Sequence, residues 1–480
     1  MPPPTLSTLH RGRAALAGSA LFAVLMTLGA CLRLLVALAY QPALLLQRDA
    51  YAYLFQAGGA GPSGGFRPAV YPLVLEPLLL GHNLAVVPAV QHVAALGIAG
   101  LLFALLRRSG AGPVASALGT APLLLDPYQV DLEQYVLTET LFELLVIGAL
   151  ALLLWGKPPS VPAAAAAGVL LVAAGLTRYA GLALIVPALI FLLVTRAGAA
   201  RIVALAAAFA VPLAAYSAVG RSLSSGGPGG KVGFFLYGRV AAFADCEGLD
   251  LAAGVRRHLC GPGPGAEAGY FKLNDRLGDL IDRPDANRVL LGFSVRVIAH
   301  QPLAYSRAVG GDLGRYFDTT PPQAEEPYAD RWRFVTSITE AHPIRFVARR
   351  GGSPPAELGF EQTFTIDRRL ASWLGAYQRY VYTWGPLLGL VLLAGTAGAI
   401  MAAGGQAPLA RTAALFSAAG LVLLLFPVAV TVYHVRYVVP ALPLVGPAGA
   451  AGASALWQRV RVRQPAGGAE SGAPPPVRSG

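Results

Sequence analysis

Residues 84–106 read LAVVPAVQHVAALGIAGLLFALL, an uncharged and mostly apolar run that ends at the pair Arg107-Arg108. About 20 such residues are enough for a helix to cross the hydrocarbon core of a bilayer. Comparable runs cover residues 14–40, 113–125, 136–155, 161–176, 181–194, 202–218, 382–402, 412–430 and 438–457. We therefore predict an all-α polytopic membrane protein, a bundle of about 10 transmembrane helices with a small, mainly helical extracytoplasmic domain.

The composition supports this class. Of the 480 residues, 55% are apolar and 13% are charged, whereas soluble domains carry about 25% charged residues. So few charges cannot cover the surface of a soluble multidomain enzyme, which excludes that class. A net charge of +12 would suggest nucleic acid in a soluble protein. Here the positions of the charges matter more than their sum, and we expect no nucleic-acid partner.

The charges predict the orientation of the chain in the plasma membrane. With a cytoplasmic N-terminus, the inner loops carry Arg107, Arg108, Lys157 and Arg196, together with other basic residues. All but one of the 25 acidic residues then fall outside or near the outer end of a span. This is the positive-inside pattern, and it predicts that both termini are cytoplasmic.

Four regions follow from these spans. They are residues 1–220, a transmembrane module with the catalytic outer loops; 221–380, an extracytoplasmic domain; 381–458, C-terminal transmembrane helices; and 459–480, a disordered cytoplasmic tail. A Gly-rich linker at residues 224–230 opens the outer domain. Inside it we expect one helix from Asp285 to about residue 300 and a second from Pro302. Residues 319–361 read as loops.

Two cysteines fall in the predicted outer domain. Cys246 and Cys260 would lie in an oxidising compartment, where disulfides persist. We predict that they form a disulfide; the alternative is two free thiols.

The first outer loop contains Asp49 and Tyr53, followed by Arg67 and Tyr71. Tyrosine favours the membrane interface, so this aspartate is placed to meet a lipid-linked substrate. Its carboxylate could take the proton from an incoming hydroxyl. The alternative is an interfacial Asp49 that pairs with Arg48 and has no catalytic role.

The second outer loop gathers acidic residues at the membrane surface, namely Asp126, Asp131, Glu133 and Glu139. Ionisable groups at membrane depth are costly and tend to be functional. Glu139 could instead serve the first turn of its helix. Asp131 or Glu133 could serve the acceptor or a divalent cation, Mg²⁺ or Mn²⁺. No zinc-like His/Cys cluster is present, and the scattered histidines read as structural.

Arginines at the outer ends of the spans form a third group: Arg67, Arg178 and Arg436, with Arg33 deeper in the first span. The arginine fork matches phosphate geometry, and lipid phosphates lie at this depth. Snorkelling of each side chain to headgroups is the alternative. Acids and arginines at one membrane face together predict a site for a phosphate-linked substrate.

These residues, in this order, resemble the GT-C superfamily of integral-membrane glycosyltransferases, which includes protein O-mannosyltransferases and lipid A aminoarabinose transferases. The matching motifs are Arg33-Leu34, Asp49 with Tyr53, Arg67-Pro68-x-x-Tyr71-Pro72, Thr138-Glu139, Thr177-Arg178, and Arg436-Tyr437 with Pro440. The segments Tyr237-Gly238-Arg239, Asp245-Cys246 and Pro302-x-x-Tyr305 also look like parts of bacterial relatives. The resemblance spans most of the chain, and its strength lies in order and spacing.

The resemblance implies an extracytoplasmic active site, a polyprenyl-phosphate sugar donor, and inversion at the anomeric carbon. Asp49 would be the base or would orient the acceptor, and Glu139 would be a secondary acid. The candidates for the donor phosphate are Arg178, Arg436, Arg67 and Arg33, and those for substrate contact are Tyr53, Tyr71 and Tyr437. One departure is that Ala50 follows Asp49 where many members have a second acid. Whether Asp126 or Asp131 supplies that partner stays open, and the case for a metal is weaker.

The partners that this reading implies are the lipid-linked donor, the bilayer, and a glycan, lipid or protein acceptor. A transporter or flippase for a lipid-linked sugar is the main alternative. Transporters tend to have repeated halves and polar groups at the midplane, and neither pattern is visible here. A non-catalytic scaffold for envelope synthesis is the third reading.

Overall fold

The computed structural model describes residues 6–45, 49–58, 67–222, 232–249, 251, 259–260, 277, 280, 283–319, 333–336, 364–401 and 408–463. Nearly all regular structure in these ranges is helical, which confirms the predicted all-α class. The predicted linker, most of the loop region 319–361 and the tail beyond residue 463 lie outside the described residues.

The first half of the chain contains α1 (Leu6–Ala39), β1 (Tyr40–Gln41), α2 (Asp49–Ala57), α3 (Val70–Leu79), α4 (Val86–Ser109), α5 (Pro113–Leu118), α6 (Ala121–Leu125), α7 (Pro127–Gln134), α8 (Glu139–Trp155), α9 (Val161–Gly175), η1 (Tyr179–Leu184), α10 (Ile185–Val194) and α11 (Ala199–Ser222). The second half contains α12 (Val232–Val240), α15 (Ala286–His300), α16 (Pro302–Arg315), β2 (Thr365–Ile366), α19 (Arg368–Tyr380), α20 (Gly385–Met401), α21 (Pro408–Val430), η6 (Val435–Tyr437), η7 (Val439–Ala441) and α22 (Leu442–Arg463).

Five segments of the described chain are long and apolar enough to cross a membrane: Ala17–Ala39, Val86–Ser109, Ala199–Val219, Pro408–Val430 and Val435–Val460. A sixth is formed if α19 and α20, which meet at a 57° bend, count as one span. The other predicted spans are shorter here. Residues 113–125, for example, divide into α5 and α6, so the predicted count of about 10 spans stays a prediction.

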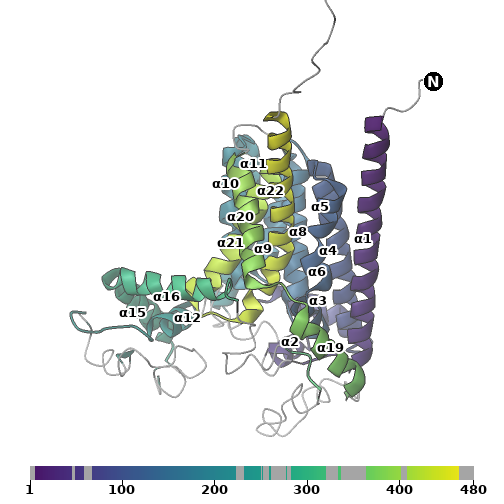
Figure 1. Cartoon of the computed structure of the whole chain (residues 1–480). Coiled ribbons are helices and arrows are strands. Elements are labelled where there is room, and N and C mark those ends of the chain that lie inside the picture. Colours follow the sequence, from purple (N-terminus) through teal and green to yellow (C-terminus); the bar gives the residue numbers. More distant parts are fainter. Residues whose placement is uncertain are drawn as a thin grey trace, which may run out of the picture.

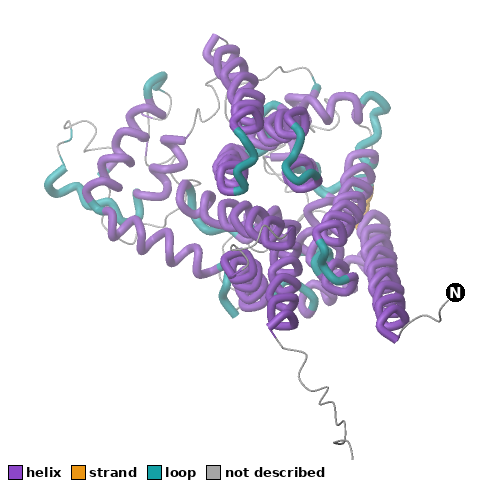
Figure 2. Tube along the Cα trace, turned by 90° about the horizontal axis from the view of Figure 1, so that it is seen from above, coloured by secondary structure: helices purple, strands orange, loops and turns teal. Residues whose placement is uncertain are grey.

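The long helices run side by side in one bundle (Figure 1). α1 starts and α22 ends at the same end of this bundle, while α2, α3 and α19 lie at the other end (Figure 1). Seen from above, helices α12, α15 and α16 project from one side of the bundle (Figure 2). We call these three helices the side arm. α22 extends to Arg463, into the region predicted as a tail.

Close packing of α20 against α22 depends on glycine. A Cβ atom on Gly398 would lie 2.4 Å from the Cα of Gly452, so the two backbones approach each other as closely as small residues allow. Membrane helices commonly pack through such small residues. The segment Val435–Val460, which includes most of α22, lies inside the bundle, and 78% of its most apolar stretch is buried.

A two-residue strand pair holds α19 beside the end of α1. β1 pairs with β2 in antiparallel register, with Tyr40 opposite Ile366. The N–H of Asp367 donates to the carbonyl of Ala39, and the Asp367 carboxylate accepts from the N–H groups of Arg369 and Leu370 as the N-cap of α19. The strand pair and the N-cap hold α19 at the end of the bundle where α2 and α3 also lie (Figure 1).

The side arm contains both helices predicted for the outer domain. α15 follows Asp285, and α16 begins at Pro302 after a break at Gln301. Proline is suited to the first turn because its missing N–H has no helical acceptor there. The predicted disulfide is also present, with the Cα atoms of Cys246 and Cys260 6.0 Å apart.

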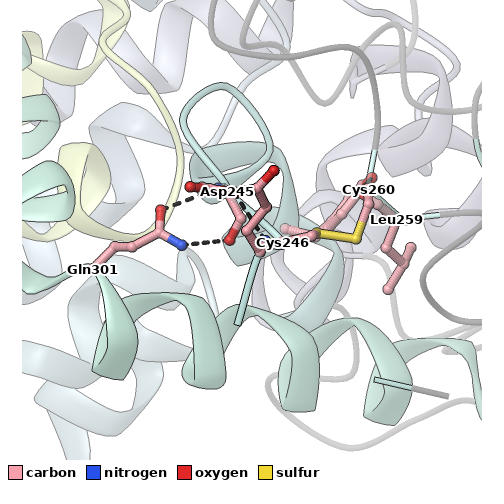
Figure 3. Close-up of a disulfide and its surroundings, with 7 residues drawn as sticks. Asp245, Cys246, Leu259, Cys260 and Gln301 are labelled. Atoms are coloured by element: carbon pink, nitrogen blue, oxygen red, sulfur yellow. Dashed lines mark hydrogen bonds between the residues drawn. A yellow bond between two sulfur atoms is a disulfide. The ribbon is translucent and has the colours of Figure 1, made fainter. Parts of the chain in front are cut away.

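Polar contacts tie the disulfide-bonded segment to α16. Gln301 donates from Nε2 to the carbonyl of Asp245 (2.6 Å), and its Oε1 accepts from the N–H of the same residue (3.1 Å), beside the disulfide (Figure 3). The pairing of the amide with both main-chain groups fixes the start of α16 against Cys246.

Candidate functional site

Asp49 is the first residue of α2, at the same end of the bundle as the turn before α8. Its Oδ1 lies 2.7 Å from Nη2 of Arg67, and its Oδ2 accepts from Nη1 of Arg436 at 2.8 Å. The side chain keeps 29% of its exposure. Arg48, the alternative partner, lies outside the described residues, and the contacts observed are with two more distant arginines.

Glu139 is the first residue of α8 and is almost completely buried (1% exposed). Its Oε1 accepts hydrogen bonds from Nη1 of Arg178 (2.5 Å) and from Nε of Arg436. Arg178 also donates to the hydroxyl of Thr138, at 3.2 Å. The carboxylate therefore lies between two guanidinium groups from distant parts of the chain.

Arg436 joins the two carboxylates. It lies in the 3-10 helix η6, between α21 and α22, where its N–H donates to Nδ1 of His434 at 3.1 Å. Nη1 reaches Asp49 and Nε reaches Glu139, and only 9% of the side chain is exposed. We call Asp49, Arg67, Glu139, Arg178 and Arg436 the charge cluster; it brings together residues separated by up to 387 positions.

The charge cluster carries an excess of positive charge. Three arginines face two carboxylates, which leaves about one unit of positive charge in a partly dehydrated site. Arginine binds phosphate oxygens through two parallel N–H groups. An anion that entered the site would therefore find guanidinium groups already positioned, but it would have to compete with the carboxylates for them.

The environment of Asp49 also changes its acidity. Burial raises the pKa of its carboxyl group, but Arg67 and Arg436 together lower it by more, so that the pKa lies below the ordinary value of 3.8. Asp49 is therefore a carboxylate at neutral pH. The ion pairs with the arginines reduce the basicity of this carboxylate toward a hydroxyl proton.

Tyrosines surround the charge cluster on one side. The rings of Tyr53 and Tyr71 meet edge to face, with centroids 5.1 Å apart, and the guanidinium of Arg67 lies 5.4 Å from the Tyr53 ring centroid. Tyr437 follows Arg436 directly, and its ring lies 5.5 Å from that of His434. Of the three tyrosines predicted for substrate contact, Tyr53 and Tyr437 thus lie on α2 and η6, which carry cluster residues, and Tyr71 lies on α3, shortly after Arg67.

A second polar network lies in the bundle between α1, α4 and α7. Glu133 is fully buried and accepts from Nε and Nη2 of Arg33, at 2.8 and 2.7 Å. His92 contacts Glu133 through Nδ1 and Gln134 through Nε2, each at 2.9 Å. Arg33 also donates to the carbonyls of Gly29, Leu123 and Leu124. Arg33 therefore belongs to this network and not to the charge cluster. Its position does not support the predicted contact with a donor phosphate.

The remaining predicted acids have different surroundings. Asp126 caps α7 by accepting from the N–H of Tyr128, and it also accepts from the N–H of Thr383 at 2.7 Å. Asp131 is buried, and neither of its carboxylate oxygens has a hydrogen-bond partner among the described residues. Neither of these residues contacts Asp49 in the interactions of the described chain. The acid that shares a partner with Asp49 is Glu139, through Arg436.

Sequence reasoning missed two members of the second network. Gln91 donates from Nε2 to the carbonyls of Glu133 and Tyr135, and Gln129 donates to Glu133 and Glu143. The sequence did contain an indication for Gln91 and for His92, because these two polar residues interrupt an otherwise apolar run. Polar residues inside such a run face the bundle interior and pair with one another.

The arrangement gives no support to a bound metal ion. Among the described residues, no group of three or more His, Cys, Asp or Glu side chains could hold one. Within the charge cluster, each carboxylate already has two arginine partners. The predicted divalent cation thus has no donor set in this part of the chain.

No family model matches the chain, and a search of curated proteins finds no match.

Proposed function

We propose that the protein is an inverting glycosyltransferase that transfers a sugar from a polyprenyl-phosphate donor to an acceptor at the outer face of the plasma membrane. In this proposal both termini are cytoplasmic, and the apolar helices make up about 10 spans. The observation that carries it is the bridge from Arg436 to both Asp49 and Glu139. It joins a carboxylate base to cations suited to a phosphate.

The first step is capture of the donor phosphate. Arg67 and Arg436 contact Asp49 on α2, and Arg178 joins them through Glu139; in this proposal the three guanidinium groups meet the lipid phosphate at the outer membrane surface. Phosphate oxygens would replace carboxylate oxygens as partners of at least one guanidinium group. Glu139, held on the far side of Arg178 and Arg436, would keep these arginines oriented.

The second step is transfer. Release of Asp49 from an arginine would restore its basicity, and it would then take the proton of the acceptor hydroxyl. The acceptor oxygen forms a bond to the anomeric carbon while the bond from that carbon to the phosphate oxygen breaks. The electron pair leaves with polyprenyl phosphate, whose developing charge the arginines stabilise. Attack opposite the leaving group inverts the anomeric centre.

The test compares Asp49→Asn with a matched control, Asp285→Asn. Both are ion-paired aspartates near a helix start, but Asp285 lies on the side arm and contacts Arg283. Lipid-linked sugars and envelope glycans would be measured by mass spectrometry in cells that lack the gene and carry each variant. We expect the wild type and the control to restore transfer, and Asp49→Asn to accumulate the lipid-linked sugar.

Wild-type glycan levels with Asp49→Asn at normal abundance would overturn the assignment. The same is true if the purified protein moves a lipid-linked sugar across proteoliposomes without forming a new glycosidic bond, since that is the behaviour of a flippase.

A further inference from the structure

One aspartate of the side arm makes a hydrogen bond to the segment that carries Arg436. Asp312 on α16 accepts through Oδ2 from Nη1 of Arg239 on α12 (2.6 Å) and from the main-chain N–H of Tyr433 (3.0 Å). Its Oδ1 lies 3.9 Å from Nη1 of Arg315, one turn further along α16. The carboxyl group of Asp312 therefore joins α16 to α12 and also to the connection between α21 and η6.

The ring of Tyr433 is held by the same helix. The guanidinium of Arg315 lies 4.1 Å from the Tyr433 ring centroid, within the range of a cation–π contact. The ring of Tyr316 packs against it at 4.8 Å. One turn from the start of α16, the hydroxyl of Tyr305 donates to the carbonyl of Ala429, near the end of α21 (2.9 Å). α16 thus fixes the main chain on the N-terminal side of η6 at two points.

Tyr433, whose main-chain N–H donates to Asp312, is close in sequence to Arg436 of the charge cluster. Only His434 and Val435 lie between Tyr433 and Arg436. The main-chain N–H of Arg436 donates a hydrogen bond to Nδ1 of His434. A shift of the Tyr433 main chain would pass directly to Arg436, whose guanidinium must reach Asp49 and Glu139 together. An arginine fork needs both partners in plane, so a displacement of about 1 Å would break one of the two contacts.

The ion pair between Asp312 and Arg239 is largely buried. Arg239 keeps 4% of its side-chain exposure and Asp312 keeps 19%. Within the described chain, Nε and Nη2 of Arg239 have no hydrogen-bond partner, so Asp312 supplies the compensating charge for this cation. Loss of the carboxylate would leave Arg239 buried without that charge, and it would also remove the acceptor of the Tyr433 N–H that joins the arm to the segment.

We propose that Asp312 is a positioning residue: it sets Arg436 through the main chain of Tyr433, so that the side arm controls the geometry of the phosphate-binding arginine. This inference rests on the proposed function for its consequence in catalysis. The coupling between Asp312 and Arg436 is a separate physical claim, and it can be measured without any substrate.

The first measurement is a thermal-unfolding cycle on the full chain in nanodiscs, with the wild type, Asp312→Ala, Asp49→Asn and the double variant. Asp49→Asn weakens one of the two ion pairs of Arg436. If Asp312 positions Arg436, the melting-temperature loss from Asp49→Asn should shrink by at least about half when Asp312 is already Ala, as expected for coupled sites. Asp285→Ala replaces Asp312→Ala in the matched control cycle, where the losses should add.

The second measurement uses activity. Asp312→Ala should raise the KM for the lipid-linked donor by about five- to tenfold, the effect of one lost hydrogen bond, and leave the acceptor KM unchanged. Asp312→Asn, which keeps an oxygen for the Tyr433 N–H, should restore much of the difference. If Asp312→Ala does not insert, Asp312→Asn takes its place in both measurements, with smaller effects in the same direction.

The outcomes separate the two claims. Additive melting-temperature losses in the Asp312 and Asp49 cycle would overturn the positioning role whatever the activity. Coupled losses in a protein that transfers no sugar would support the positioning role and overturn the proposed function. An equal rise in donor and acceptor KM would reduce Asp312 to a structural anchor and would also contradict the proposal.

Discussion

At the scale of single residues, Arg436 decides what the site can do. It is the shared partner of Asp49 and Glu139, and removal of one member of a buried ion pair leaves the other charge uncompensated. The two carboxylates thus offset most of the arginine charge, and about one unit of positive charge remains. In the proposed mechanism a donor phosphate would bind by exchange of partners, and its capture would be linked to the activation of Asp49 as a base.

The acidity of Asp49 predicts a particular pH dependence. Because its pKa in the folded protein lies below 3.8, its ion pairs stabilise the fold fully above the unfolded pKa. This contribution is lost as the pH falls through the lower folded value. We expect the melting temperature of the wild type to change little through this group between pH 7 and 5, and to fall below about pH 4.

Differential scanning fluorimetry of the wild type and of Asp49→Asn across this range provides the check. The two curves should converge at low pH, where the wild-type carboxyl group is protonated. A constant separation down to the most acidic condition would contradict the assigned ion pairs.

Sequence alone could select these residues but could not pair them. Asp49, Glu139, Arg178 and Arg436 each stand beside a predicted span, and a charge at that depth is a signal in itself. Asp126 gives the same signal, yet it caps α7 and bonds to Thr383. Arg33 does so too, yet it pairs with Glu133. Which acid meets which arginine depends on contacts between distant helices, and a one-dimensional pattern does not contain them.

At the scale of elements, glycine determines how closely the C-terminal helices pack. The approach of Gly398 to Gly452 leaves no room for a methyl group between α20 and α22. The sequence is rich in glycine throughout, so its abundance gave no indication of this contact. The prediction of apolar runs located both helices but not the face through which they meet.

A methyl group at this crossing should destabilise the bundle. We expect Gly452→Ala to cost about 1–3 kcal/mol, the usual effect of an overpacked core, and to lower the melting temperature in nanodiscs. Gly100→Ala on α4 is the matched control, because a Cβ atom there meets nothing within 4 Å. Equal melting temperatures for Gly452→Ala and the control would show that the helices do not approach as described.

The break between predicted and observed spans has a local cause. Residues 113–125 form a single apolar run in the sequence, but Gly119 and Thr120 end α5 before α6 begins. Residues 181–194 likewise start in the 3-10 helix η1 before α10. Hydropathy measures how apolar a segment is and does not register where its helix stops, so the existence of apolar segments was predictable and their lengths were not.

At the scale of the whole molecule, the side arm and the charge cluster lie at one end of the bundle, and the two described ends of the chain lie at the other. The basic residues predicted for the inner face include Arg108, at the end of α4. The proposed orientation, which rests on the positive-inside pattern, would place the cluster on the extracytoplasmic side.

Cysteine labelling in intact cells would test this orientation. In a background where Cys31 is replaced by Ser, a membrane-impermeant thiol reagent should modify Arg283→Cys on the side arm. It should leave Arg108→Cys unmodified until the membrane is permeabilised. Arg283 is 57% exposed, and Arg108 is exposed as well, so accessibility within the fold does not limit either reaction. The reverse labelling pattern would place the charge cluster in the cytoplasm.

The position of Arg436 near the end of the chain has a consequence for biosynthesis. A ribosome would release Asp49, Arg67, Glu139 and Arg178 long before η6 and α22 emerge. Until then Glu139 has Arg178 as its arginine partner but lacks the cation that links it to Asp49. The site is thus completed only as the last helix enters the bundle. A nascent chain that stalls before residue 436 would have Asp49, Arg67, Glu139 and Arg178 but would lack the arginine that links the two carboxylates.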